Sequence, residues 1–120
     1  MNKKAYIYDT SKGFSSFIKH YYSDKMFIET CTSKKKFLLE KIIGFDTCFF
    51  IVHDMEDFFN LMKIFTKVKH FFIGSPNRKM SEKIEALNFE GVIVLNFQHC
   101  KAEILKIINF NLKLEEFILD

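Results

Sequence analysis

The sequence predicts an α/β protein: a three-layer (βα)5 fold with a doubly wound parallel sheet in strand order 2-1-3-4-5. The first observation is a rhythm of short apolar runs, which begin 21 to 23 residues apart at Ala5, Met26, Cys48, Phe71 and Val92. The second is that a stretch of helical periodicity follows each run. Parallel strands joined by such short connections need right-handed crossovers, and five of them commonly adopt this order.

Each expected element has its own pattern. The strands are nearly continuous apolar runs, which is typical of a parallel sheet covered by helices on both faces. Each expected helix carries apolar residues three and four positions apart, so that one stripe faces the sheet. In chain order, these stripes are Phe14, Phe17, Ile18, Tyr21 and Tyr22; Leu38, Leu39, Ile42 and Ile43; Phe58, Leu61, Met62 and Phe65; Met80, Ile84 and Leu87; and Ile104, Leu105, Ile108 and Leu112.

The expected helices have recognisable ends. The basic run Lys34-Lys35-Lys36 opens the second helix as a solvated face, and Gly44 ends that helix. The fourth helix is entered through Ser75-Pro76, with Ser75 as its N-cap, and it closes near Asn88. The fifth helix can start near His99.

Residues 1–120 are expected to form one domain, with the last helix and an apolar tail from about residue 99. The last helix is expected to finish by about Asn111, yet five of the last nine residues are apolar. Either this tail folds back over a hydrophobic gap, or it forms a contact with a second copy or another protein beside the fourth helix, fifth strand and fifth helix. The apolar tail residues are Leu112, Leu114, Phe117, Ile118 and Leu119.

Composition excludes several classes of protein. The formal net charge is only +3, from 18 basic and 15 acidic residues spread along the chain, which argues against nucleic-acid binding. No apolar run approaches the 18 residues of a membrane span. The cysteines number three, without a CxxC spacing, which favours a reducing cytoplasm as the location.

Ligands of such folds gather at the carboxyl ends of the strands. Asp9 follows the first expected strand and Asp54 the third, so the expected strand order brings these two carboxylates together. If no metal ion lies between them, their repulsion would favour protonation of one of them. Ser75 follows the fourth strand and Asn96 the fifth.

This layout resembles the receiver domain of two-component response regulators (the CheY-like fold) over essentially the whole chain. The resemblance implies that Asp54 stands at the phosphoryl-acceptor position and that Asp9, with Asp54, would hold Mg²⁺. It also implies that Ser75, or Gly74 in an alternative alignment, occupies the hydroxyl switch position. Asn96 falls at the second switch position, where receivers carry a lysine.

The chain departs from the receiver pattern at several of these places. Thr10 replaces the second acid, so a Mg²⁺ ion would lose a charged oxygen ligand. Asn96 replaces the lysine and Phe97 the proline that follows it. We therefore expect an atypical, non-enzymatic receiver that needs no cofactor and acts in bacterial signalling by binding another protein, without efficient phosphorylation. The alternative is an active response regulator that uses Asp54 and Mg²⁺.

Structural roles compete with these functional ones. Asp54 is also a suitable N-cap for the third helix, and Thr10 or Ser11 could cap the first. His53 precedes Asp54, so strand alternation predicts that it points the other way and packs against the core.

A second, weaker resemblance concerns the segment that follows the first strand. It is similar to the phosphate loop of flavodoxins, in which hydroxyls and backbone N–H groups at a helix N-terminus hold the phosphate of FMN. That resemblance implies phosphate contacts from Thr10, Ser11, Gly13 and Ser15, and hence an FMN carrier as a further alternative.

Overall fold

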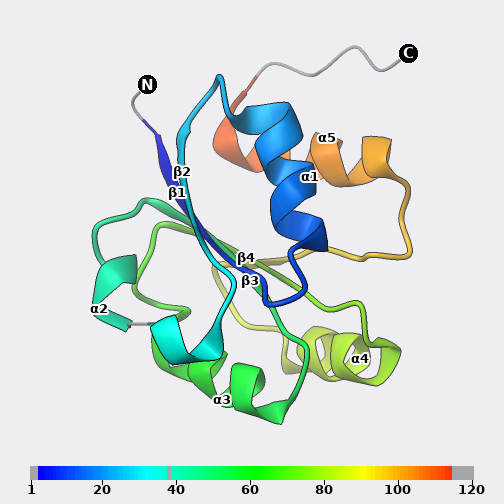
Figure 1. Cartoon of the computed structure of the whole chain (residues 1–120). Helices are drawn as coiled ribbons and strands as arrows, with labels where there is room; N and C mark the ends of the chain where they lie inside the picture. Colours follow the sequence, from blue (N-terminus) through cyan, green and yellow to red (C-terminus); the bar gives the residue numbers. More distant parts are fainter. Residues whose placement is uncertain (1–2, 38, 115–120) are drawn as a thin grey trace.

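A computed structural model describes residues 3–37 and 39–114 of the chain, and it confirms the predicted sheet. All strand pairs are parallel and the order is β2-β1-β3-β4-β5 (Figure 1). The first residue of every strand lies within one position of the predicted start. The strands are β1 (Lys4–Tyr8), β2 (Phe27–Cys31), β3 (Thr47–Ile51), β4 (His70–Gly74) and β5 (Val92–Val94).

Helices cover both faces of the sheet. Two of them lie on one face, α1 (Gly13–Tyr22) and α5 (Lys101–Leu112). The other face carries α2 (Leu39–Ile42), α3 (Met55–Ile64) and α4 (Arg78–Leu87), as Figure 1 shows. This three-layer arrangement is the one that right-handed crossovers produce in a sheet of this order.

Side chains of the strands alternate between two cores, one on each face of the sheet. Tyr8 and Phe50 point toward α2, α3 and α4, where they meet Leu61 and Ile84. Neighbouring positions in the same strands point toward α1 and α5. This second core contains Ile7, Phe49, Ile18, Tyr22, Ile104, Leu105, Ile108 and Leu112, so the predicted stripe of the fifth helix is confirmed.

The second helix differs from the prediction. Lys34–Lys36 forms a separate 3₁₀-helix, and Phe37 after it is extended, with φ of −74° and ψ of 120°. The α-helix begins only at Leu39, so the basic run does not open it. Ile43, expected in the buried stripe, is 67% exposed.

The third helix is also rotated relative to its predicted stripe. Leu61 and Ile64 are buried, but Met62 is 40% exposed. Asp57 is buried on the same face as Leu61, because its carboxylate receives hydrogen bonds within the protein. A charged residue therefore occupies a core position that the apolar pattern could not reveal.

The fourth helix begins two residues later than the predicted Ser75 N-cap implies. Its N-cap is Asn77, whose Oδ1 accepts a hydrogen bond from the Met80 N–H at 3.1 Å. The prediction for Ser75 is therefore wrong: its hydroxyl instead donates to the carbonyl of Val52 at 2.5 Å and so joins the ends of β3 and β4. The predicted closure at Asn88 is confirmed, because this residue adopts a left-handed conformation with φ of 47°.

The fifth helix ends at Leu112. Lys113 turns into the left-handed region with φ of 56°, and the Leu114 N–H donates to the carbonyl of Asn109 at 2.8 Å. This bond pattern is that of a Schellman C-cap. The predicted tail contact falls largely on residues 115–120, which lie outside the described residues.

Within residues 3–37 and 39–114, no helix has the length and apolar character needed to cross a membrane. The three cysteines are free thiols; Cys31 and Cys48 are buried and Cys100 is exposed. Burial raises the pKa of the Cys48 thiol.

Candidate functional site

Asp9, the residue directly after β1, is fully buried at the carboxyl edge of the sheet (0% exposed). Its Oδ2 accepts hydrogen bonds from the backbone N–H groups of Phe14 and Ser15, at 2.8 and 3.1 Å. Its Oδ1 accepts from the N–H and the hydroxyl of Ser11, at 3.2 and 2.9 Å. The carboxylate therefore caps the first turn of α1, a role that the sequence analysis gave to Thr10 or Ser11.

His53 supplies a fifth contact to Asp9. Its Nε2 lies 3.0 Å from Asp9 Oδ1, and its side chain is only 21% exposed. The expectation that His53 points away into the core is wrong. Strand β3 ends at Ile51, so the alternation of a strand no longer governs the direction of a side chain two residues later.

A second buried carboxylate, Asp57, lies on the other side of His53. Asp57 Oδ2 accepts a hydrogen bond from the His53 backbone N–H at 2.9 Å, and Oδ1 accepts from the Tyr8 hydroxyl at 2.7 Å. Burial, and then the bond to Asp57, raise the pKa of Tyr8. Tyr8, Asp57, His53 and Asp9 thus form one hydrogen-bonded chain from β1 to the start of α3 and back.

Asp54 also lies at the carboxyl edge, but its partner is different. Its carboxylate pairs with the ammonium group of Lys34, which also lies 3.7 Å from Glu56. Its other oxygen accepts from the Asp57 N–H at 2.9 Å, so the predicted N-cap role of Asp54 is confirmed. Lys34 is the first residue of the 3₁₀-helix after β2, 20 residues before Asp54.

The two predicted site acids have lowered pKa values. Burial alone would raise the pKa of Asp9, but hydrogen bonds from His53, Ser15 and Ser11 outweigh it. The pKa of Asp54 is lowered by Lys34 first and by the Asp57 N–H second. The expectation that repulsion would protonate one of the two is therefore wrong, because each acid has its own set of donors.

This geometry does not fit the Mg²⁺ site that the receiver resemblance implies. A carboxylate offers about four lone-pair positions, and the five contacts of Asp9 occupy them all. A metal ion at Asp9 would have to displace hydrogen bonds that hold α1. Among the described residues, no group of three or more His, Cys, Asp or Glu side chains is placed to hold a metal ion.

The flavodoxin-like segment also uses its hydrogen-bond donors within the protein, to bind Asp9. The N–H groups of Ser11 and Ser15, two of the predicted phosphate contacts, donate to its carboxylate. The Ser15 hydroxyl donates to the carbonyl of Lys12 at 3.0 Å. Thr10 is half-buried and Gly13 exposed in the same turn. An internal anion thus occupies the place that a phosphate would take, so this loop does not fit FMN phosphate.

The two predicted switch positions, Ser75 and Asn96, do lie together. They line one hollow of about 210 Å³, together with Arg78 and Ser81 from α4. Asn96 Oδ1 accepts a hydrogen bond from the Gln98 N–H at 2.8 Å, which closes the turn toward α5. The acids Asp9 and Asp54 are not among the residues that line this hollow.

Phe97 explains how that turn is placed. Its ring packs so closely on Gly74 that a Cβ at this glycine would lie 2.8 Å from the ring. The ring also stacks on Phe14, with centroids 5.2 Å apart. Phe97 therefore forms part of an aromatic cover over the end of β4 and the start of α1.

Four residues of this network were missed as site residues by sequence reasoning: Tyr8, Lys34, His53 and Asp57. In the sequence, Tyr8 belongs to an expected strand and Asp57 to an expected helix. Lys34 is one of three adjacent lysines and cannot be distinguished from the other two. To find them from the sequence, one would need to know that β1, the 3₁₀-helix after β2 and the start of α3 are in contact.

Comparisons with protein-family models, with curated proteins and with solved structures find no match to this chain.

Proposed function

We propose that the chain is a regulatory domain of receiver-like fold, in bacterial signalling, that acts by binding another protein and does not use Asp54 as an efficient phosphoryl acceptor. The observation that carries the proposal is the engagement of both acids. Asp9 accepts from five donors, and Asp54 is held by Lys34 and by the Asp57 N–H. Neither acid retains a carboxylate oxygen without a donor.

The position of the cation supports the same conclusion. Receivers place a lysine after the fifth strand, where it pairs with the phosphoryl group, and here Asn96 has its side-chain oxygen engaged by Gln98. Lys34 supplies a cation from the opposite side, through the 3₁₀-helix after β2. There it neutralises Asp54 in the resting state, which stabilises the free carboxylate and opposes its reaction.

Binding of a protein partner is supported by the outer surface of α3. Met55, Phe59 and Met62 lie at i, i+4 and i+7, so they share one helix face, and they are 41%, 59% and 40% exposed. On α4, the ammonium of Lys83 lies 3.9 Å from the Met55 sulfur. Apolar side chains gathered in this way on a surface are typical of protein interaction sites.

The chemical part of the proposal can be tested with a small phosphodonor such as acetyl phosphate, in the presence of Mg²⁺. Intact mass measurement should show no lasting phosphoprotein. In Lys34→Ala the Asp54 carboxylate is no longer paired, so the phosphorylated fraction should be larger than in the unmodified chain. This fraction should still be low, because Asn96 stands where receivers carry the lysine. A stable adduct on the unmodified chain that Asp54→Asn abolishes would contradict the proposal and favour an active response regulator.

FMN binding makes a different and simple prediction. A flavin carrier would be yellow when purified and would show flavin absorption in the visible range. We expect a colourless protein, because the N–H groups that would hold the phosphate donate to Asp9.

A further inference from the structure

A second hollow opens at the carboxyl edge of the sheet, between α1 and the start of α5. Its volume is about 330 Å³. The end of β3 and the loops that follow β1, β4 and β5 all contribute to its lining. We call it the aromatic hollow, and the residues that line it include Phe14, Phe17, Pro76, Phe97, His99 and Lys101.

Three phenyl rings form a continuous apolar surface in the aromatic hollow. Phe14 stacks on Phe97 with ring centroids 5.2 Å apart, and its ring lies 5.9 Å from that of Phe17. All three residues are half-buried, so each keeps part of its surface accessible. Such rings favour a flat aromatic occupant, because aromatic pairs gain energy in offset-stacked and edge-to-face contacts.

The fold holds these rings in place before any ligand arrives. Phe14 and Phe17 lie three positions apart on α1, so they share one face of that helix. Phe97 packs closely on Gly74 of β4. A surface that is already ordered binds a ligand without the entropic cost of ordering it.

The start of α5 adds positive charge to the same hollow. Lys101 and His99 both line it and both are exposed. His99 Nδ1 lies 3.6 Å from Glu103 Oε2. Within residues 3–37 and 39–114, the ammonium of Lys101 forms no ion pair, so it can donate to an anionic group of a ligand.

The loop after β1 is not the place for that anionic group. Ser11 and Gly13 also line the hollow, but the N–H and the hydroxyl of Ser11 donate to Asp9. An anion beside three phenyl rings therefore finds its partner at Lys101. Rings next to a single cationic group match a ligand with an aromatic body and one carboxylate.

The position and the size of the hollow favour a small molecule as its occupant. Ligands of open α/β sheets bind outside the carboxyl ends of the strands, where this hollow lies. Its volume is near the lower end of the range for small-molecule pockets, roughly 300–1,000 Å³. A compact ligand of one or two fused rings fits this description.

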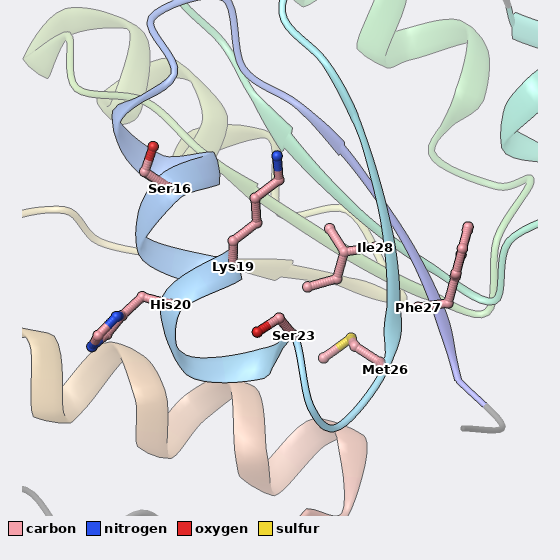
Figure 2. Close-up of a pocket in the computed structure, with 7 residues that line it drawn as sticks. All are labelled: Ser16, Lys19, His20, Ser23, Met26, Phe27 and Ile28. Carbon is pink, nitrogen blue, oxygen red and sulfur yellow. The ribbon is translucent and has the colours of Figure 1, made fainter.

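The larger hollow between α1 and β2 has a different lining. Its volume is about 450 Å³, and its side from α1 carries Lys19 and His20. Figure 2 shows Ile28 on the side of β2 toward α1 and the ring of Phe27 on the other side. Cations are thus present there without a cluster of phenyl rings, so this hollow serves as an internal comparison.

We propose that the aromatic hollow binds a small aromatic acid. Its rings would lie against Phe14, Phe17 and Phe97, and its carboxylate would accept hydrogen bonds from the ammonium of Lys101. His99 offers a second donor at the same rim. This proposal goes beyond the proposed function and does not depend on it, because neither Asp54 nor the exposed face of α3 takes part.

The direct test is an NMR titration of the full chain with 2-naphthoate. We expect saturable shifts of the amides of Phe14, Phe97 and Lys101, and nuclear Overhauser effects between the naphthyl protons and the rings of Phe14 and Phe97. The neutral amide 2-naphthamide has the same rings without the charge. It should bind about tenfold more weakly, because it loses a charge-assisted hydrogen bond.

Several outcomes of this titration would overturn the proposal. One is the absence of saturable binding, and another is saturable shifts confined to α3 or to the hollow of Figure 2. Equal affinity for the two probes would overturn the assignment of an acid. Shifts of the aromatic hollow that depend on protein concentration without any probe would assign it to a contact between two copies of the chain.

A set of variants provides a second readout. Lys101→Gln should weaken 2-naphthoate about tenfold and leave 2-naphthamide unchanged, whereas Phe17→Ala should weaken both probes. Lys106→Gln is the matched control, because Lys106 is exposed on the same helix and does not line the hollow. The remaining amide shifts report whether each variant is folded. Unchanged 2-naphthoate affinity in folded Lys101→Gln would overturn the proposal.

Discussion

At the scale of single residues, Asp9 is the centre of the carboxyl edge. It is an internal anion: its carboxylate takes the N–H groups at the start of α1 that could otherwise bind a phosphate. Its negative charge also suits the positive end of the helix dipole. The same carboxylate receives His53, so it joins α1 to the segment after β3. An acid in a position typical of catalysis thus holds the fold together.

We expect Asp9→Asn to lower the free energy of unfolding by about 1.5–3 kcal/mol at pH 7, the usual loss for hydrogen bonds to a charged group. An asparagine also turns an N–H₂ group toward some of the donors that Asp9 accepts. Chemical denaturation measures this change. Asp24→Asn, at an exposed position just after α1, removes the same charge without these contacts and should change stability by less than about 0.5 kcal/mol.

The difference between Asp9→Asn and the unmodified chain should shrink in acid. The pKa of Asp9 is lower in the folded chain than its ordinary value, so the folded chain holds this proton less strongly than the unfolded chain. Its stabilisation is complete above the ordinary aspartate pKa, about 3.9, and is lost as the pH falls through the lower folded pKa. A difference that stays constant between pH 7 and pH 2.5 would contradict this account.

At the scale of elements, the turn after β5 packs against β4 and covers part of the carboxyl edge of the sheet. Leu95 continues the ladder with an N–H bond to Ile73 at 2.7 Å, and Phe97 then folds back over Gly74. Only a glycine lets the ring approach the strand this closely. The cover over the carboxyl edge therefore depends on one small residue in β4 and one large residue after β5.

Gly74→Ala should destabilise the fold by about 1–3 kcal/mol, the usual cost of overpacking a core. The added Cβ would lie 2.8 Å from the Phe97 ring and 3.0 Å from the Leu95 carbonyl oxygen. Thermal or chemical unfolding measures the loss. Gly44→Ala is the matched control, because its Cβ would meet the nearest atom at an ordinary 3.8 Å. Equal effects at both positions would show that the close approach at Gly74 carries no special cost.

At the scale of the whole molecule, the two faces of the sheet differ in what they expose. The helix α3 presents Met55, Phe59 and Met62, whereas α5 presents Phe110, which is 83% exposed. The apolar tail predicted a partner contact or homodimer beside α4, β5 and α5. In the described residues, the larger group of exposed apolar side chains lies on α3.

A photoreactive amino acid at Phe59 should therefore capture a partner protein in the native cell, and the same probe at Phe110 serves as the control. We expect a discrete cross-linked species that contains one other protein from position 59, and a weak or absent one from position 110. Cross-links of the chain to itself would identify a homodimer. Capture from position 110 alone would place the interaction on α5, near the surface that the apolar tail predicted.

The sequence by itself determined the architecture of this protein. Apolar runs of strand length and helical stripes are local signals, and each run starts within one residue of its strand, because burial on both faces requires a continuous apolar segment. The acids after β1 and β3 could be placed at one edge for the same reason: parallel strands in this order align their carboxyl ends.

Only the tertiary structure decided what these acids do. The pairing of Lys34 with Asp54 and of His53 with Asp9 joins residues 20 and 44 positions apart, in loops where no periodicity governs side-chain direction. The buried Asp57 looks like a solvent-exposed helix residue until Tyr8 donates to it. Donors supplied across the fold lower the pKa values of Asp9 and Asp54, and those donors distinguish a structural carboxylate from a reactive one.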